Sequence, residues 1–185
     1  MAVTPNLTAG SILTASQVNT YMINSGLVYL STTTITSSGQ NIANAFNNSY
    51  TNYLIVCNEF VTSATNAVVA FRLGASTSRT EYSYGGTNVN TSSGAISADS
   101  SAAATSAFIG YTKGVPGGNQ SYIFNLLGPQ TATRKTWSTT WGNGQYMGQT
   151  TGVDSLASAQ TDINFIVGSG TLTGGTVTIY GYRKA

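Results

Sequence analysis

Few side chains in this sequence could act as acids or bases. The chain has five carboxylates and no histidine among its 185 residues. Hydrolysis of a glycosidic bond needs two carboxyl groups roughly 5–10 Å apart, one of them with a raised pKa. No motif singles out such a pair, so a carbohydrate-active enzyme is only a lesser alternative. The five carboxylates are Glu59, Glu81, Asp99, Asp154 and Asp162.

Nucleophilic and metal chemistry have no stronger support. Histidine is the commonest general base and the commonest metal ligand, and without it a serine nucleophile would need a lysine as its base. No Ser-x-x-Lys motif occurs. The single cysteine, Cys57, lies in a strongly apolar run, where a thiol packs as a small hydrophobic side chain. We therefore expect no catalytic residue, no metal site and no cofactor.

Aromatic side chains offer a different chemistry, which is surface recognition. Antibody-type binding surfaces favour tyrosine together with serine, glycine and asparagine, because tyrosine gives a broad contact area at low entropic cost. Five aromatic residues near turn-rich segments are candidates for contact with a receptor or a glycan. The alternative is that they pack in the core or line a subunit interface. These residues are Tyr82, Tyr84, Trp137, Trp141 and Tyr146.

The composition narrows the class of partner. Only 6% of the residues are charged, against about 25% in a typical soluble domain, while 41% are hydrophobic. The net charge of +2 is too small for the clustered phosphate contacts of a nucleic-acid-binding protein. No apolar run approaches the ~18 residues of a membrane-spanning helix. We expect no nucleic-acid partner, no membrane insertion, and synthesis in a reducing cytoplasm.

One segment near the N-terminus predicts a helix. Thr14 to Gln17 has the form of a capping box, and Leu13 with Val18 could form the hydrophobic staple that accompanies it. Val18, Tyr21 and Met22 then share one face. Three turns are too short to be stable alone. Residues 1–26 are therefore interpreted as an arm that anchors the chain through Leu13, Val18, Tyr21 and Met22.

The chain beyond Gly26 predicts strands, about nine or ten in all. Turn signals stand at Gly85-Gly86, 116–119, 142–144 and Gly174-Gly175. Residues 85–106 lack apolar periodicity and predict a long surface loop. The strand candidates cover 27–35, 53–57, 67–73, 81–84, 107–112, 121–127, 134–141, 163–167 and 176–182.

Many short strands without intervening helices are typical of a β-sandwich or barrel. The buried apolar run at 53–57 favours a two-layer structure. The predicted fold class is all-β, an antiparallel β-sandwich that is jelly-roll-like, with a short N-terminal helical arm. We divide the chain into the arm (1–26) and a β-sandwich domain (27–185).

The two ends of the chain resemble proteins of one class. Residues 7–19, LTAGSILTASQVN, resemble an opening common among tailed-bacteriophage structural proteins. Residues 168–184, GSGTLTGGTVTIYGYRK, resemble the final strand of phage fibre and head-surface domains. Neither motif contains a catalytic residue. The resemblance implies a virion protein, often trimeric, on the tail or the capsid exterior.

This resemblance leads to a functional hypothesis. The chain is interpreted as a phage virion structural protein, tail-associated as a fibre or adhesion protein and anchored through its arm to other virion proteins. The alternative is a capsid decoration or head-fibre protein, and a lectin-like module is a lesser one. A surface with few charges fits a homo-oligomer, expected to be a trimer, that is covered by neighbours in a large assembly.

Overall fold

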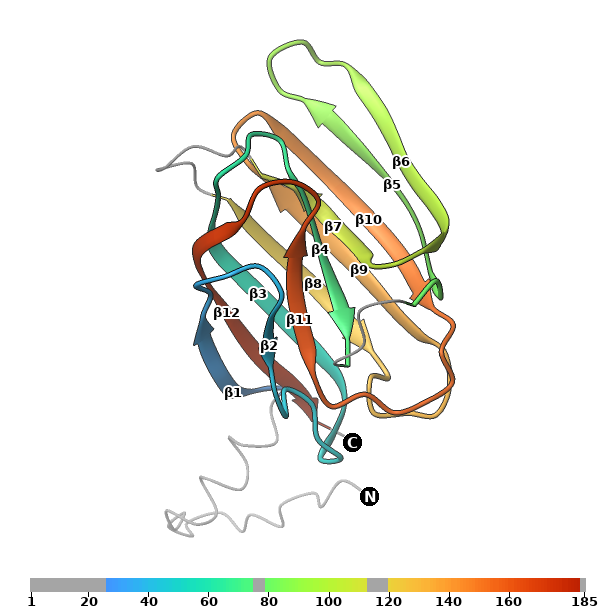
Figure 1. The fold of residues 1–185 in the computed structure, drawn as a ribbon. Coiled ribbons are helices and arrows are strands. Elements are labelled where there is room, and N and C mark those ends of the chain that lie inside the picture. The colour runs from blue at the N-terminus through green and yellow to red at the C-terminus, as the bar shows by residue number, and fades with distance from the viewer. Residues whose placement is uncertain (1–25, 75–78, 113–119, 184–185) are drawn as a thin grey trace, which may run out of the picture.

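The computed structural model describes residues 26–74, 79–112 and 120–183, and these residues form β-strands only (Figure 1). No helix long and apolar enough to cross a bilayer occurs in these three ranges. The strands are β1 (Leu27–Thr34), β2 (Gln40–Ile42), β3 (Tyr50–Thr62), β4 (Val68–Leu73), β5 (Tyr82–Asn90), β6 (Ile96–Ala104), β7 (Ala107–Tyr111), β8 (Ser121–Leu127), β9 (Lys135–Gly142), β10 (Tyr146–Asp154), β11 (Ile163–Val167) and β12 (Leu172–Arg183).

The strands form two antiparallel sheets that pack face to face. The larger sheet has eight strands in the order β1-β12-β3-β8-β9-β10-β5-β6, and the smaller has four in the order β2-β11-β4-β7. Every neighbouring pair is antiparallel. The β5–β6 hairpin extends beyond the smaller sheet (Figure 1). The predicted all-β, two-layer class is therefore confirmed for the described residues.

Alternation along the strands explains how this sequence forms a sandwich. In β9, the buried residues Lys135, Trp137, Thr139 and Trp141 alternate with exposed threonines and a serine. Because successive strand residues point to opposite faces, such a segment buries one face and leaves the other to solvent. β8 repeats the pattern with buried Tyr122, Phe124 and Leu126.

Aromatic rings fill the space between the sheets. Phe71 of β4 stacks on Phe124 of β8, with ring centroids 5.1 Å apart, and Trp137 meets Phe71 edge-on at 5.4 Å. Phe165 of β11 contacts both Phe60 and Phe124. Burial of each such side chain contributes about 1.5–3 kcal/mol. The core therefore joins the smaller sheet to the centre of the larger one.

The predicted long loop at residues 85–106 is wrong, because most of it forms the β5–β6 hairpin. The two strands pair from Tyr82 with Ala104 to Val89 with Ile96, and Gly85-Gly86 lies within β5 instead of forming a turn. β6 is an edge strand with mostly exposed residues. Such a strand is held by backbone hydrogen bonds and needs no apolar alternation, which is why the sequence pattern missed it.

Three other segments also differ from the prediction. Gly174-Gly175 lies inside β12, where the register with β3 shifts, and Gly175 has a φ of 123°. A Cβ there would lie 2.5 Å from a ring carbon of Phe60, so this glycine permits a bulge and a close approach. β2 and β10 were not predicted as strands. The turn expected at 142–144 is present between β9 and β10.

Three predicted features lie outside the described residues. They are the helical arm with Leu13, Val18, Tyr21 and Met22, most of the segment 1–26 to which that arm was assigned, and the turn at 116–119.

Candidate interaction face

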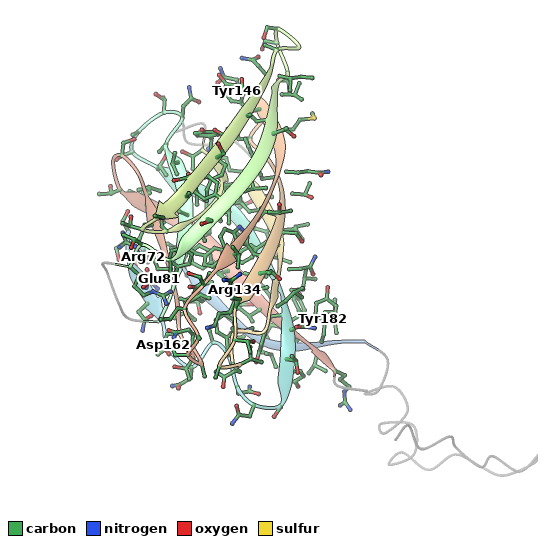
Figure 2. All side chains as sticks on the ribbon, turned by 90° about the vertical axis from the view of Figure 1, so that its right-hand side faces the viewer. Arg72, Glu81, Arg134, Tyr146, Asp162 and Tyr182 are labelled. Carbon is green, nitrogen blue, oxygen red and sulfur yellow. The ribbon has the colours of Figure 1, made fainter. Side chains whose placement is uncertain are left out.

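The uncovered side of the larger sheet is a continuous face of small polar and apolar side chains. We call it the outer face and define it by the strand register. It is seen edge-on at the right of Figure 2, where Tyr182 lies on it. The first row across the strands contains Leu27, Tyr182, Asn52, Leu127, Thr136, Val153 and Ser83, and the second contains Tyr29, Tyr180, Leu54, Asn125, Ser138, Thr151, Gly85 and Ser100. The third row contains Thr32, Thr178, Val56, Ile123, Thr140, Gln149, Thr87 and Ala98. Met147, Val89 and Ile96 form one corner of the face.

None of the residues that define the outer face is charged. The charged residues Arg72, Glu81 and Asp162 lie on the other side of the molecule in Figure 2. One pair of threonine hydroxyls on this face, Thr32 and Thr178, forms a hydrogen bond across neighbouring strands at 3.0 Å. The face can therefore lose its contact with water without the large cost of burying a charge.

Large apolar side chains that remain exposed gather on the same face. All six that the described residues contain belong to the outer face. They are spread along this face from β1 through β8 to the corner formed by β10 and β6. Exposed apolar surface concentrated on one side of a protein is typical of interaction sites. The six are Leu27, Tyr29, Ile96, Ile123, Leu127 and Met147.

The dimensions of the outer face match those of a specific interface. Eight strands, each about 4.8 Å wide, and three rows of outward-facing residues about 6.6 Å apart cover roughly 38 by 20 Å, or about 800 Å². A standard protein–protein interface buries about 800 Å² on each partner. The outer face is therefore large enough to hold one partner without help from other surfaces.

Three of the five aromatic recognition candidates are buried, which corrects their expected surface position. Tyr82, Trp137 and Trp141 are at most 3% exposed. The Trp137 indole donates to the carbonyl of Phe108 at 3.3 Å. The Tyr82 hydroxyl accepts from the Leu73 amide at 2.8 Å. These residues tie the two sheets together, which was the alternative weighed for them.

The other two candidates, Tyr84 and Tyr146, are half-buried on the opposite side of the larger sheet from the outer face. Tyr84 packs beside Phe108, with ring centroids 5.4 Å apart, and Tyr146 lies 6.5 Å from Tyr111. They sit where β5, β6 and β10 extend past β7. Tyr111 connects the two, because its ring contacts both Tyr146 and Phe108.

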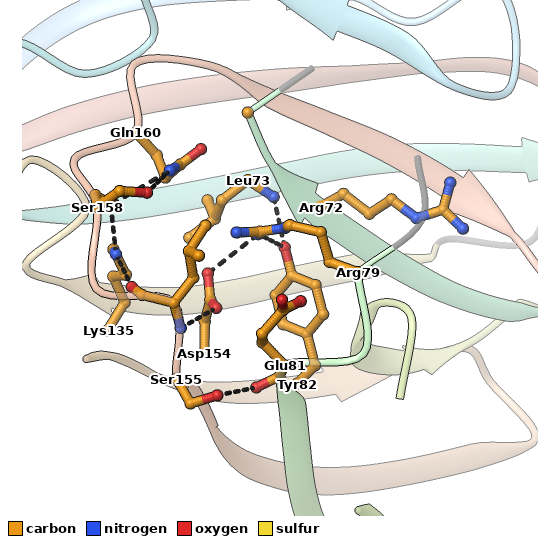
Figure 3. A network of polar contacts seen from close by, with 12 residues as sticks. Arg72, Leu73, Arg79, Glu81, Tyr82, Lys135, Asp154, Ser155, Ser158 and Gln160 are labelled. Carbon is orange, nitrogen blue, oxygen red and sulfur yellow. Dashed lines mark hydrogen bonds and ion pairs between the residues drawn. The ribbon is translucent and has the colours of Figure 1, made fainter. Parts of the chain in front are cut away.

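A buried polar network occupies the other end of β10 (Figure 3). Asp154 Oδ2 lies 3.1 Å from the Arg79 guanidinium, which also donates to the Tyr82 hydroxyl. Asp154 Oδ1 accepts from the Leu156 amide at 3.0 Å. Lys135 is fully buried and donates to the carbonyls of Leu156 and Ser158.

Burial lowers the pKa of Lys135, while the nearby Asp154 carboxylate acts in the opposite direction. The Asp154 carboxylate pairs directly with Arg79, whereas Lys135, its register partner on β9, is held by the carbonyls of Leu156 and Ser158. Lys135 also fixes the segment that connects β10 to β11. These contacts give the network a structural role in joining that connection to the sheet.

Two of the other carboxylates, Asp162 and Asp99, have separate partners. Asp162 accepts hydrogen bonds from the Asn41 side chain, the Asn44 backbone amide and the Thr161 hydroxyl. All three lower the pKa of the Asp162 carboxyl group, and the bond from Asn41 has the largest effect. Asp99 accepts from Asn88 and Tyr111. Within the described ranges, no group of three or more Cys, Asp or Glu side chains is placed to hold a metal ion.

Comparison of the chain with protein-family models, with curated protein sequences and with solved structures found no match.

Proposed function

We propose that this chain is a structural protein of a tailed-phage virion, tail-associated as a fibre or adhesion subunit, and that it packs against copies of itself through the outer face. The observation that carries the proposal is the outer face itself, which is wide and uncharged and carries all six exposed large apolar side chains of the described residues. The resemblance of both chain ends to phage structural proteins supports the proposal that the particle is a tailed-phage virion.

The strand order adds a second line of support. Eight of the strands form two four-stranded layers, β1-β12-β3-β8 and β2-β11-β4-β7, and the chain crosses between layers at nearly every step. This is the order of a jelly roll, a double Greek key that viral capsid and lectin domains use. The β5–β6 and β9–β10 hairpins are then additions that widen one layer. A widened layer also widens the face available to a neighbour.

Copies of this chain are the best-matched partner for the outer face. A partner must tolerate a surface that offers no charge for an ion pair, and the outer face of a second copy has that character. The area of about 800 Å² is sufficient for a stable contact. The outer face packed on the outer face of a second copy closes a two-fold dimer; in the trimer expected from the resemblance it would instead pack on a different surface of the next subunit around a ring.

We predict that Ile123→Asp weakens self-association by roughly thirtyfold or more. An unpaired charge at a buried interface costs about 2 kcal/mol or more, which corresponds to that factor in the dissociation constant. Light scattering of the purified full chain over a range of concentrations would measure the change. Ser169→Asp is the control, because Ser169 is exposed between β11 and β12, away from the outer face. A wild-type chain that stays monomeric at every concentration would contradict self-packing.

The placement in the particle is tested by removing residues 1–26. We expect the truncated chain to fold, because the core lies within β1–β12, but to be missing from assembled particles. Mass spectrometry of purified particles would measure its incorporation, and a density map of the whole particle would show what contacts Leu13, Val18, Tyr21 and Met22. A few trimers per particle supports the tail, whereas a copy number that follows the capsid lattice would establish a decoration protein. Normal incorporation of the truncated chain would refute anchoring.

A further inference from the structure

A small hollow lies on the inner side of the larger sheet, where the β5–β6 hairpin extends past β7. It has a volume of about 220 Å³ and is lined by Asn66, Asn88, Ser97, Asp99, Tyr111 and Tyr146. These residues come from the β3–β4 connection and from β5, β6, β7 and β10. The hollow is on the opposite side of the sheet from the outer face, so both surfaces could be occupied at once. Its size suits one small ring and not an extended peptide.

The polar groups of the hollow are held in fixed positions. The Asp99 carboxylate accepts from the Tyr111 hydroxyl at 2.6 Å through one oxygen and from the Asn88 amide at 2.6 Å through the other. The Tyr111 carbonyl accepts from the Tyr122 hydroxyl and from the Asn143 side chain. Asn88 is only 5% exposed. Because each member is tied to a different strand, the group is organised before any ligand arrives.

Hydrogen-bonding capacity is left over for a ligand. A carboxylate has about four acceptor positions, and Asp99 uses one on each oxygen. The side-chain oxygen of Asn88 and the side chains of Asn66, Ser97 and Tyr146 make no hydrogen bond to another described residue. The hollow therefore presents acceptors and hydroxyl or amide donors side by side, as a ligand with adjacent hydroxyl groups requires.

Aromatic rings form the apolar part of the hollow. Tyr111 and Tyr146 both line it, and their ring centroids are 6.5 Å apart. Burial, together with the hydrogen bond to Asp99, raises the pKa of Tyr111, so its hydroxyl remains a neutral donor over the physiological range. An aromatic face beside fixed polar groups can bind a ring that has an apolar C–H side and a polar rim.

Other ligand classes fit these groups less well. One carboxylate is too few for a calcium site, which takes six to eight oxygen ligands and gains affinity from their charge. No cationic side chain lines the hollow, so it offers nothing to a phosphate or a carboxylate. A neutral polyhydroxyl ring needs neither a cluster of carboxylates nor a cationic side chain, and its size matches the volume of the hollow.

We propose that this hollow binds a single neutral pyranose of a surface polysaccharide. Two adjacent sugar hydroxyls donate to Asp99 and to the Asn88 side-chain oxygen, while a C–H side of the ring lies on Tyr146. The inference concerns recognition without bond cleavage and does not depend on where the chain sits in a particle.

Binding to the full chain is tested by saturation-transfer NMR with a panel of neutral monosaccharides: glucose, galactose, mannose and their N-acetyl derivatives. At least one is expected to bind with a millimolar dissociation constant, since one hollow offers few direct hydrogen bonds. Asp99→Asn should weaken that binding at least tenfold. Tyr146→Ala, which leaves the hydrogen bonds of Asp99 in place, should abolish ring contact and weaken binding by a similar factor.

Thr151→Ala is the matched control, because Thr151 lies on the same strand as Tyr146 but on the outer face. Circular dichroism of each variant separates lost folding from lost binding. The proposal is overturned if no sugar in the panel binds at 50 mM or less, which is on the order of the weakest affinity this hollow should give. It is equally overturned if binding survives both hollow variants, or if binding requires added calcium.

Discussion

Replacing Asp154 with alanine should lower the free energy of unfolding by about 3–5 kcal/mol. Asp154 is fully buried and faces Arg79, which is 8% exposed, and Lys135, which is also fully buried. Removing one member of a buried ion pair leaves its partner charged and uncompensated, and that desolvation penalty accounts for most of the loss. Equilibrium denaturation in urea would measure the change.

Asp162→Ala is the matched control for this experiment. Asp162 also accepts three hydrogen bonds, but it is not buried, so water replaces the lost partners and the loss should be about 1 kcal/mol. The double variant Arg79→Met with Asp154→Leu should recover much of the stability that Asp154→Ala loses, because it removes both charges together. If Asp154→Ala costs no more than Asp162→Ala, the network does not hold the β10–β11 connection.

The strongly patterned strands could be predicted from the sequence. Segments such as 121–127 and 163–167 combine β-branched or aromatic residues with clear turn signals, and both became strands with the expected bounds. β6 could not be found in this way. Its residues from Ile96 to Ala104 are small and mostly exposed, so its strand state depends on pairing with β5, which sequence periodicity does not report.

The candidate sites were predictable only in part. The aromatic pattern pointed to Tyr146, which lines the hollow, and equally to Trp137 and Trp141, which are buried. The difference depends on which face of β9 and β10 meets the smaller sheet. The low content of charged residues predicted a surface that neighbours could cover. Its position on one continuous face follows from the register of the eight strands, which the composition does not reveal.

The register of β9 with β10 could have been predicted from the spacing of two tryptophans and two glycines. Trp137 and Trp141 are four residues apart, as are Gly148 and Gly152, and a hairpin turn at 142–146 places each tryptophan opposite one glycine. The indole of Trp137 lies over Gly152, and the indole of Trp141 lies over Gly148. An aromatic ring that covers a glycine on the neighbouring strand is a known way to fix strand register.

Gly152→Ala should therefore lower the free energy of unfolding by about 3 kcal/mol, at the upper end of the range for overpacking. The new Cβ would lie 2.2 and 2.4 Å from two ring carbons of Trp137 and 2.7 Å from the Ser83 carbonyl oxygen. The buried indole is hydrogen-bonded to Phe108 and cannot turn away without breaking that bond. Urea denaturation and the near-ultraviolet signal of the tryptophans would report the loss of stability and the displaced ring.

Gly85→Ala provides the control, because Gly85 lies mid-strand on the neighbouring β5 with open space where a Cβ would stand. It should be neutral or slightly stabilising, since alanine reduces the freedom of the unfolded chain. Trp137→Phe supplies the second half of a double-mutant cycle. If the clash is with the indole, Gly152→Ala should cost at least about 1 kcal/mol less in the Trp137→Phe background than in the wild type. Additive losses would show that the Ser83 carbonyl, and not the tryptophan, requires glycine at this position.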